Sequence, residues 1–426
     1  MSSAAAYRPE DLATPAVIAN PYPAYDALRA RSPVSGYADW PPGTVPGQDQ
    51  PLQAWALLRH AHVVAAAKDH VRFSSANFQQ DTGAPGLMLV NHDDPEHAAL
   101  RKIVIQAFTM KRVRELRPHV EQVVADLINA LPSGEVDLVS TLCAPLPARL
   151  MVRLLGLPDD MADPFQRWAN AFMLSADMTP EDRNQSNLDM VQYFQKVVAD
   201  RAQRLADGGV PSDDLIDALL TAEADGEKLS HDEVWRFCFT LVVAGSETTM
   251  YYAANCLHML LQHPDVFAAL QQDRSLIARF QAETLRLSGP PQRLFRKALA
   301  DVNIGDTTIR AGEWVALFFA SANHDPDVFP EPERFRLDRE NSGQHLSFGH
   351  GIHYCLGAPL ANLETACLIE GSPAYGIANR GSGTTRTLSV EHPTGEMTVV
   401  ATLDNQGTVA EAAILRTARK LMDAAP

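Results

Sequence analysis

Cysteine is scarce in this sequence: five residues are spread over 426 positions, and no two of them form a CxxC pair. A disulfide framework needs an even set of closely spaced cysteines, so the pattern excludes one and predicts a reducing, cytoplasmic location. Positive charge is also short, because 36 Lys and Arg face 52 Asp and Glu, a formal net charge of −16. Nucleic-acid binding depends on clustered positive charge, so we expect no nucleic-acid partner.

Long uninterrupted apolar runs are missing as well. Residues 1–9 do not combine a basic start with an apolar stretch, so no signal peptide is expected. The most apolar segment, 237–261, is interrupted by Ser246-Glu247-Thr248-Thr249 and by Asn255. A bilayer span requires about 20 mostly apolar residues, and we therefore expect no membrane anchor.

Helical periodicity dominates what is present. Apolar residues recur at helical spacing from Glu96 to Leu261, and Pro264 ends the long last helix of that stretch. Strand-like patterns are confined to short segments around 54–58 and 302–318. The fold class predicted is mainly α with a small β component.

One cysteine lies in an unusual context, the segment Phe348-Gly-His-Gly-Ile-His-Tyr-Cys-Leu-Gly357. Two glycines before Cys355 permit a tight turn, and Pro359 suits the first turn of a helix. Backbone N–H groups at a helix N-terminus favour a thiolate. From the residues alone, a buried structural cysteine and a zinc site with His350 and His353 stay open as alternatives, although the second ligand cluster of a structural zinc site is missing.

This segment resembles the haem-ligand signature of the cytochrome P-450 family, F-G-x-G-x-H-x-C-x-G. The resemblance implies the family's fold, with haem b as cofactor and Cys355 as the axial thiolate that favours O–O cleavage. It implies that Phe348 packs beside the sulfur, that His353 reaches a haem propionate, and that Gly349 and Gly357 shape the loop around the cofactor.

A second segment, Ala244-Gly245-Ser246-Glu247-Thr248-Thr249, places a glycine and polar groups inside the apolar helix. A polar stripe that meets another helix would explain it equally well. The segment resembles the family's oxygen-activation motif. By that resemblance Ala244 and Gly245 lie beside the haem, while Glu247 and Thr248 are catalytic groups that supply protons as O₂ is activated.

Three further patterns are ordinary by themselves but fall where the family has functional residues. Glu283-x-x-Arg286 and Arg334 resemble its buried structural triad. His97-x-x-x-Arg101 and Arg296 resemble its propionate ligands, and forked arginine donors suit carboxylates.

Together these motifs imply a monooxygenase that hydroxylates a small hydrophobic substrate with O₂ as co-substrate. The resemblance implies a ferredoxin-type electron donor with an NAD(P)H-dependent reductase, and a monomer. The expected pocket wall is Leu87, Met88, Val90, Phe172, Met173, Val243 and Leu294. The alternative is a chimeric or C-terminally disrupted haem-binding protein with little or no turnover.

The resemblance spans about residues 21–370, and we expect residues 1–370 to form the haem-thiolate domain. Gly371 and Pro373 should break the helix that follows the cysteine loop. Residues 371–426 form an atypical tail. Its last 45–50 residues, including the stretches 388–399 and Arg416–Met422, resemble the C-terminal end of PrpF-type isomerases. Ordinary strands and a terminal helix that replace the family's own tail stay open as the alternative.

Overall fold

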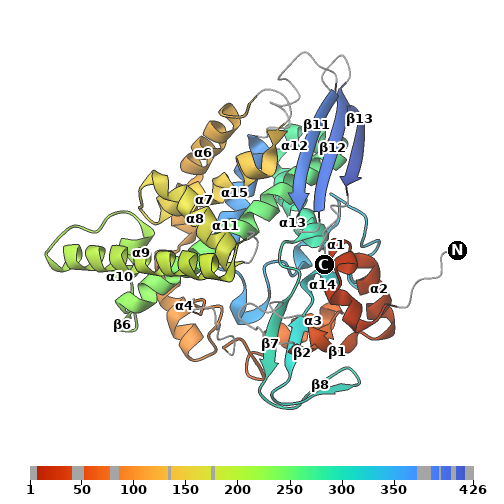
Figure 1. Cartoon of the computed structure of the whole chain (residues 1–426), viewed down its shortest axis with the longest axis horizontal. Coiled ribbons are helices and arrows are strands. Elements are labelled where there is room, and N and C mark those ends of the chain that lie inside the picture. The colour runs from red at the N-terminus through yellow and green to blue at the C-terminus, as the bar shows by residue number, and fades with distance from the viewer. Residues whose placement is uncertain are drawn as a thin grey trace.

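The computed structural model describes residues 7–40, 52–76, 86–132, 136–173 and 178–371, and the strands 385–392, 395–403 and 409–417. Helices dominate, as predicted (Figure 1). The principal helices are α2 (Tyr22–Arg31), α3 (His60–Lys68), α4 (Glu96–Ala107), α5 (Met110–Glu115), α6 (Arg117–Asn129), α7 (Pro145–Leu154), α8 (Ala162–Phe172), α9 (Pro180–Ala206), α10 (Leu215–Thr221), α11 (His231–Gln262), α12 (Pro264–Gln272), α13 (Ile277–Ser288) and α15 (Ala358–Glu370). Short helices α1 (Pro15–Ala19) and α14 (Phe319–Asn323) complete the set.

The 32-residue helix α11 runs through the middle of the molecule. A capping box starts it: the Ser230 side chain accepts from the N–H of Glu233, whose carboxylate accepts from the N–H of Ser230. Pro264 begins α12 and ends α11 at Gln262, where the sequence placed the boundary. Helices α7, α8, α9, α13 and α15 pack around α11, which explains its high apolar content.

A five-stranded sheet has the order β1-β2-β10-β7-β3. Its strands are β1 (Val34–Trp40), β2 (Leu52–Leu57), β3 (Phe73–Ser74), β7 (Leu294–Ala298) and β10 (Trp314–Leu317). Val315 of β10 pairs with Arg296 of β7, and Ser74 of β3 pairs with Lys297. The sheet therefore places Arg296 next to residues that are more than 200 positions earlier in the chain.

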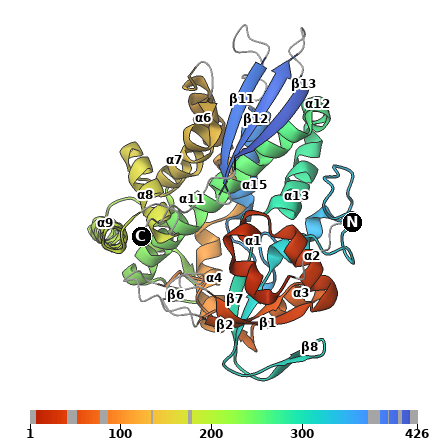
Figure 2. The same cartoon turned by 45° about the vertical axis from the view of Figure 1, so that its right-hand side comes forward.

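The C-terminal strands β11 (Thr385–His392), β12 (Gly395–Leu403) and β13 (Val409–Thr417) form consecutive antiparallel pairs. Strand β11 also runs parallel to β4 (Val136–Asp137), and this ladder joins the described part of the tail to the main body. The two larger sheets lie at opposite ends of the molecule in both views (Figure 2). Of the alternative with strands and a terminal helix, the described residues show the strands: Arg416 belongs to β13, and residues 418–426 lie outside the described residues.

Helix α15 ends at Glu370, in agreement with the predicted break. It packs against α11, α6, α13 and α5, and Arg117 of α6 forms an ion pair of 2.9 Å with Glu370 at its last residue. Across the described ranges, no helix combines the length and the apolarity that crossing a membrane requires.

Candidate functional site

The Phe348–Gly357 loop presents Cys355 just before α15. The N–H of Cys355 donates to the carbonyl of Phe348 at 2.9 Å, which closes the turn. The Phe348 ring packs edge-on against Tyr252 of α11, with centroids 6.3 Å apart. The loop is thereby anchored to the central helix.

Two glycines of the loop adopt the left-handed backbone that the sequence predicted, with φ +72° at Gly349 and +73° at Gly351. A Cβ on Gly351 would lie 2.5 Å from the carbonyl oxygen of Ala67, so the turn also presses against α3. At Gly357 a Cβ would lie 3.9 Å from the Cys355 sulfur. The missing side chain at Gly357 leaves room beside the thiol.

The protonation of Cys355 differs from the simple helix-terminus prediction. Cys355 is exposed as a residue, yet desolvation of its sulfur by the surrounding protein raises the pKa of the thiol. The N–H groups of Gly357 and Ala358 and the charge of Arg101 act in the opposite direction. A metal ion that binds the sulfur would displace the proton.

Four potential cations from three segments converge beside this loop. They are His97 and Arg101 of α4, Arg296 of β7 and His353 of the loop. The rings of His97 and His353 are 4.6 Å apart. Arg101 Nη2 donates to the carbonyl of Tyr354 at 2.7 Å, which joins α4 to the residue before Cys355.

This cluster favours an anionic ligand. Arg296 is buried and has no ion pair within the described part of the chain, and burial lowers its pKa to about 10. Burial, with the nearby charge of Arg296, lowers the pKa of His353 to about 3. Nε2 of His97 and Nε2 of His353 are buried without hydrogen-bond partners in the described ranges. Carboxylate groups would satisfy both donors and both guanidinium charges.

On α11, the side chain of Thr248 donates to the carbonyl of Ala244 at 2.6 Å. Ala244 is exposed and Thr248 is half-buried, although most of their neighbours on this helix are buried, so α11 borders an open space at this turn. Glu247 is buried. The helix is continuous here, so the polar residues interrupt the apolar sequence of α11 but not its helical backbone.

Gly245 lies where α11 meets a neighbouring helix. A Cβ at this position would lie 3.1 Å from Cε of Met151, so its vacant side faces helix α7. The glycine permits close packing of α7 on α11. This contact gives the glycine a packing role, and its expected place beside the haem stays a prediction.

The expected pocket wall divides into two groups. Met88, Phe172 and Val243 are buried in one apolar cluster, and Leu87 packs against it. The N–H of Met88 donates to Thr240 Oγ1 at 2.8 Å, which brings this wall segment to α11. The other residues, Val90, Met173 and Leu294, are exposed.

The expected structural triad is correct in two members and wrong in the third. Both carboxylate oxygens of Glu283 accept hydrogen bonds of 2.8 Å from Arg286. Arg339, not Arg334, supplies the third side chain, with Nε 2.9 Å from Glu283 Oε1. The Arg334 side chain is 70% exposed and pairs with Glu331, while its backbone carbonyl accepts from Arg286 and Arg339.

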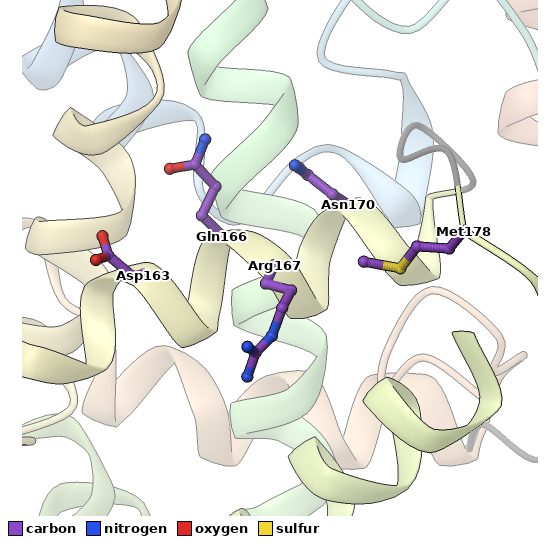
Figure 3. Close-up of a pocket in the computed structure, with 5 residues that line it drawn as sticks. All are labelled: Asp163, Gln166, Arg167, Asn170 and Met178. Atoms are coloured by element: carbon purple, nitrogen blue, oxygen red, sulfur yellow. The ribbon is translucent and has the colours of Figure 1, made fainter. Parts of the chain in front are cut away.

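A shallow depression of about 320 Å³ lies elsewhere, on helix α8 (Figure 3). Its lining is Asp163, Gln166, Arg167, Asn170 and Met178. The first four belong to α8, whose buried face instead carries Phe165, Trp168 and Phe172. The depression therefore belongs to the outer, polar side of α8, and no predicted site residue lines it.

A family model described as Cytochrome P450 matches residues 156–370, half of the chain, so this chain belongs to that family.

Individual relatives cover more of the chain. It is 38% identical to cytochrome P450 107B1 of Saccharopolyspora erythraea over 330 residues, 74% of this chain and 79% of that protein. It is 35% identical to the P450 monooxygenase PikC of Streptomyces venezuelae, with 83% of each covered. Among solved structures, ligand-free TamI matches with a TM-score of 0.77 at 32% identity, covering 88% of this chain and 87% of that one.

The chain is a cytochrome P450 monooxygenase, an oxidoreductase that uses haem, with O₂ as co-substrate. Its residues fit that cofactor. Gly357 leaves space next to the Cys355 sulfur, and the orphaned Nε2 atoms of His97 and His353 lie in a cluster with Arg101 and Arg296, as two propionates require.

Proposed function

We propose that this chain hydroxylates a hydrophobic organic substrate. The observation that carries the proposal is the exposed Ala244 and half-buried Thr248 in the middle of α11, in a chain that also presents Cys355 on a glycine-shaped loop. An exposed turn on a central helix gives O₂ and a substrate a place to meet the cofactor. The haem supplies oxygen activation when it is bound.

The chain's own residues then have separate roles. Cys355 binds the iron, and His97, Arg101, Arg296 and His353 hold the two carboxylates. Glu247 and Thr248 hold and move protons beside the oxygen site, since a carboxyl and a hydroxyl exchange protons readily through water. The Glu283–Arg286–Arg339 group fixes the segment that leads into the cysteine loop.

Apolar side chains support a hydrophobic substrate. Val90, Met173 and Leu294 expose large apolar surfaces on three different segments. Relatives include a vitamin D(3) 25-hydroxylase of Pseudonocardia autotrophica and the 6-deoxyerythronolide B hydroxylase of Saccharopolyspora erythraea. A substrate screen should therefore begin with vitamin D(3) and 6-deoxyerythronolide B, the compounds in the names of these relatives.

We also propose a ferredoxin-type donor with an NAD(P)H-dependent reductase. Basic residues lie on α4 and α5, but most are neutralised locally: Lys102 pairs with Asp225, Lys111 with Glu115 and Arg112 with Asp213. The pairs leave little net charge to attract an acidic donor. Electron transfer should consequently depend only weakly on salt.

The remaining proposals concern the whole chain. Residues 1–370 form a C-terminally incomplete haem-thiolate domain, and residues 371–426 are an atypical, partly isomerase-like tail that contributes strands β11–β13. Cys143, Cys238, Cys256 and Cys367 are buried free thiols, which supports a cytoplasmic location. The active form is a monomer, which size-exclusion chromatography with light scattering would test.

The first experiment is the difference spectrum of the reduced protein with carbon monoxide. Wild type should show the red-shifted band of a thiolate-ligated haem, and Cys355→Ser should lose it. Cys367→Ala removes a buried thiol of α15 and should keep the band. Failure of the wild type to show the band would contradict the proposed ligand.

Turnover tests the roles on α11. In Thr248→Ala, product formed per NAD(P)H consumed should fall by about tenfold, because proton delivery fails while electrons still arrive. The matched control is Ser246→Ala, a buried hydroxyl two residues away, which should leave this ratio unchanged. A thiolate band in wild type without product from any substrate would favour the alternative of a haem-binding protein with little turnover.

A further inference from the structure

Asp93 makes three connections that the motif analysis did not anticipate. Its Oδ1 accepts a hydrogen bond of 2.8 Å from the N–H of Ser75, and its Oδ2 accepts from the Ser74 hydroxyl. Its backbone carbonyl accepts from the N–H of His97 at 2.9 Å, in the first turn of α4.

These bonds join the elements that carry the cationic cluster. Ser74 belongs to β3, which pairs with β7 at Lys297, beside Arg296. Helix α4 carries His97 and Arg101. Asp93 therefore connects α4, which carries His97 and Arg101, to strand β3. Strand β3 in turn pairs with β7, which carries Arg296.

The charge of Asp93 also reaches the cluster. Its carboxylate opposes the fall in the pKa of Arg296 that burial produces. Ser74 and Ser75 are almost completely buried, so water screens this carboxylate poorly on their side. In the described part of the chain, Asp93 is the one carboxylate that acts in this way on Arg296.

We propose that Asp93 is a positioning residue for the haem: it clamps α4 to the β3–β7 ladder so that His97 and Arg296 hold the same cofactor, and its negative charge makes that cofactor harder to reduce. The inference rests on the proposed propionate roles of His97 and Arg296. The clamp depends on the hydrogen bonds of Asp93, whereas the effect on reduction depends on the negative charge of its carboxylate. Different variants therefore separate the two effects.

Haem loss tests the clamp. Holoenzyme is mixed with excess apomyoglobin, and the transfer of haem is followed by absorbance. Asp93→Ala should lose haem ~10-fold faster than wild type, the scale typical of residues that orient cofactor ligands. Ser74→Ala keeps the charge but removes one bond of the clamp, and it should lose haem at an intermediate rate. The control is Asp301→Asn, since Asp301 likewise accepts a backbone N–H, that of Ala311 at 2.9 Å, but away from the cluster.

Reduction potential tests the charge. Asp93→Asn preserves size and an acceptor oxygen, and a redox titration should give a more positive potential than that of wild type or Asp301→Asn. Equal haem loss in Ser74→Ala, Asp93→Ala and wild type would overturn the clamp, and an unchanged potential in Asp93→Asn would overturn the charge effect. If Asp93→Ala does not fold, Ser74→Ala and Asp93→Asn carry both tests. Loss of the thiolate band in wild type would instead reject the proposed function.

Discussion

Glu283 is a carboxylate without contact with water that accepts hydrogen bonds from two arginine side chains and from the N–H of Arg336. Both guanidinium groups are also buried, and each donates to backbone carbonyls of 323–334. Buried ions are tolerated only in such fully bonded arrangements, because each costs several kcal/mol to remove from water. The group therefore fixes an irregular segment that has few backbone hydrogen bonds of its own.

Replacing Arg339 and Arg334 in turn distinguishes the observed network, which contains Arg339, from the expected one, which contained Arg334. Arg339→Ala leaves part of the Glu283 charge buried without a partner and should lower the free energy of unfolding by about 3–5 kcal/mol. Arg334→Ala removes an exposed side chain and should change it by less than about 0.5 kcal/mol. Urea denaturation measures both. Equal effects would show that Arg334 belongs to the network after all.

At the scale of elements, the cysteine loop depends on backbone shapes that only glycine adopts easily. Gly351 combines a φ of +73° with a close approach to α3, whereas Gly312 has a φ of +88° and nothing within 4 Å of the position that a Cβ would take. Both positions require a left-handed backbone, but only Gly351 lacks space for a side chain. They form a matched pair.

We expect Gly351→Ala to be more destabilising than Gly312→Ala. The left-handed backbone should cost both variants about 1–2 kcal/mol, and Gly351→Ala must also displace Ala67 or the loop. Thermal unfolding measures the difference, and the carbon monoxide spectrum should show partial loss of the thiolate band in Gly351→Ala alone. An intact band with equal stability in both variants would contradict the tight loop–α3 contact.

At the scale of the whole molecule, the contact between α15 and the core buries an acid. Glu364 is buried, its Oε2 has no hydrogen-bond partner in the described residues, and burial raises its pKa to about 8. The unfolded chain releases this proton near pH 4.5, and the folded chain does so only near pH 8. The neutral form thus stabilises the fold below pH 4.5, and its contribution is lost as pH rises through 8.

This difference predicts a pH dependence that Glu364→Gln removes. Between pH 5 and 8, the unfolding free energy of wild type relative to Glu364→Gln should fall by about 3 kcal/mol. Denaturation at several pH values measures the change. Glu340→Gln, at an exposed glutamate, should show no such trend. A pH-independent difference between wild type and Glu364→Gln would mean that the carboxyl finds charge compensation in the fold.

The sequence by itself determined the features that depend on neighbouring residues. The start and end of α11, the turn at Gly349 and Gly351, and the position of Cys355 before α15 follow from caps, glycines and prolines within a few positions. The helical class follows from periodicity in the same way. Steric and hydrogen-bonding preferences of this kind act between residues a few positions apart, so a short segment is enough to predict them.

Only the tertiary structure decided which distant residues meet. The motif resemblance pointed to Arg334, whereas the fold turns Arg339, five residues later, inward to Glu283. It turned the vacant side of Gly245 toward Met151, and it made Asp93 a link between α4 and β3. These outcomes depend on packing between segments that lie far apart in the chain, because burial and long-range hydrogen bonds exist only once those segments have come together.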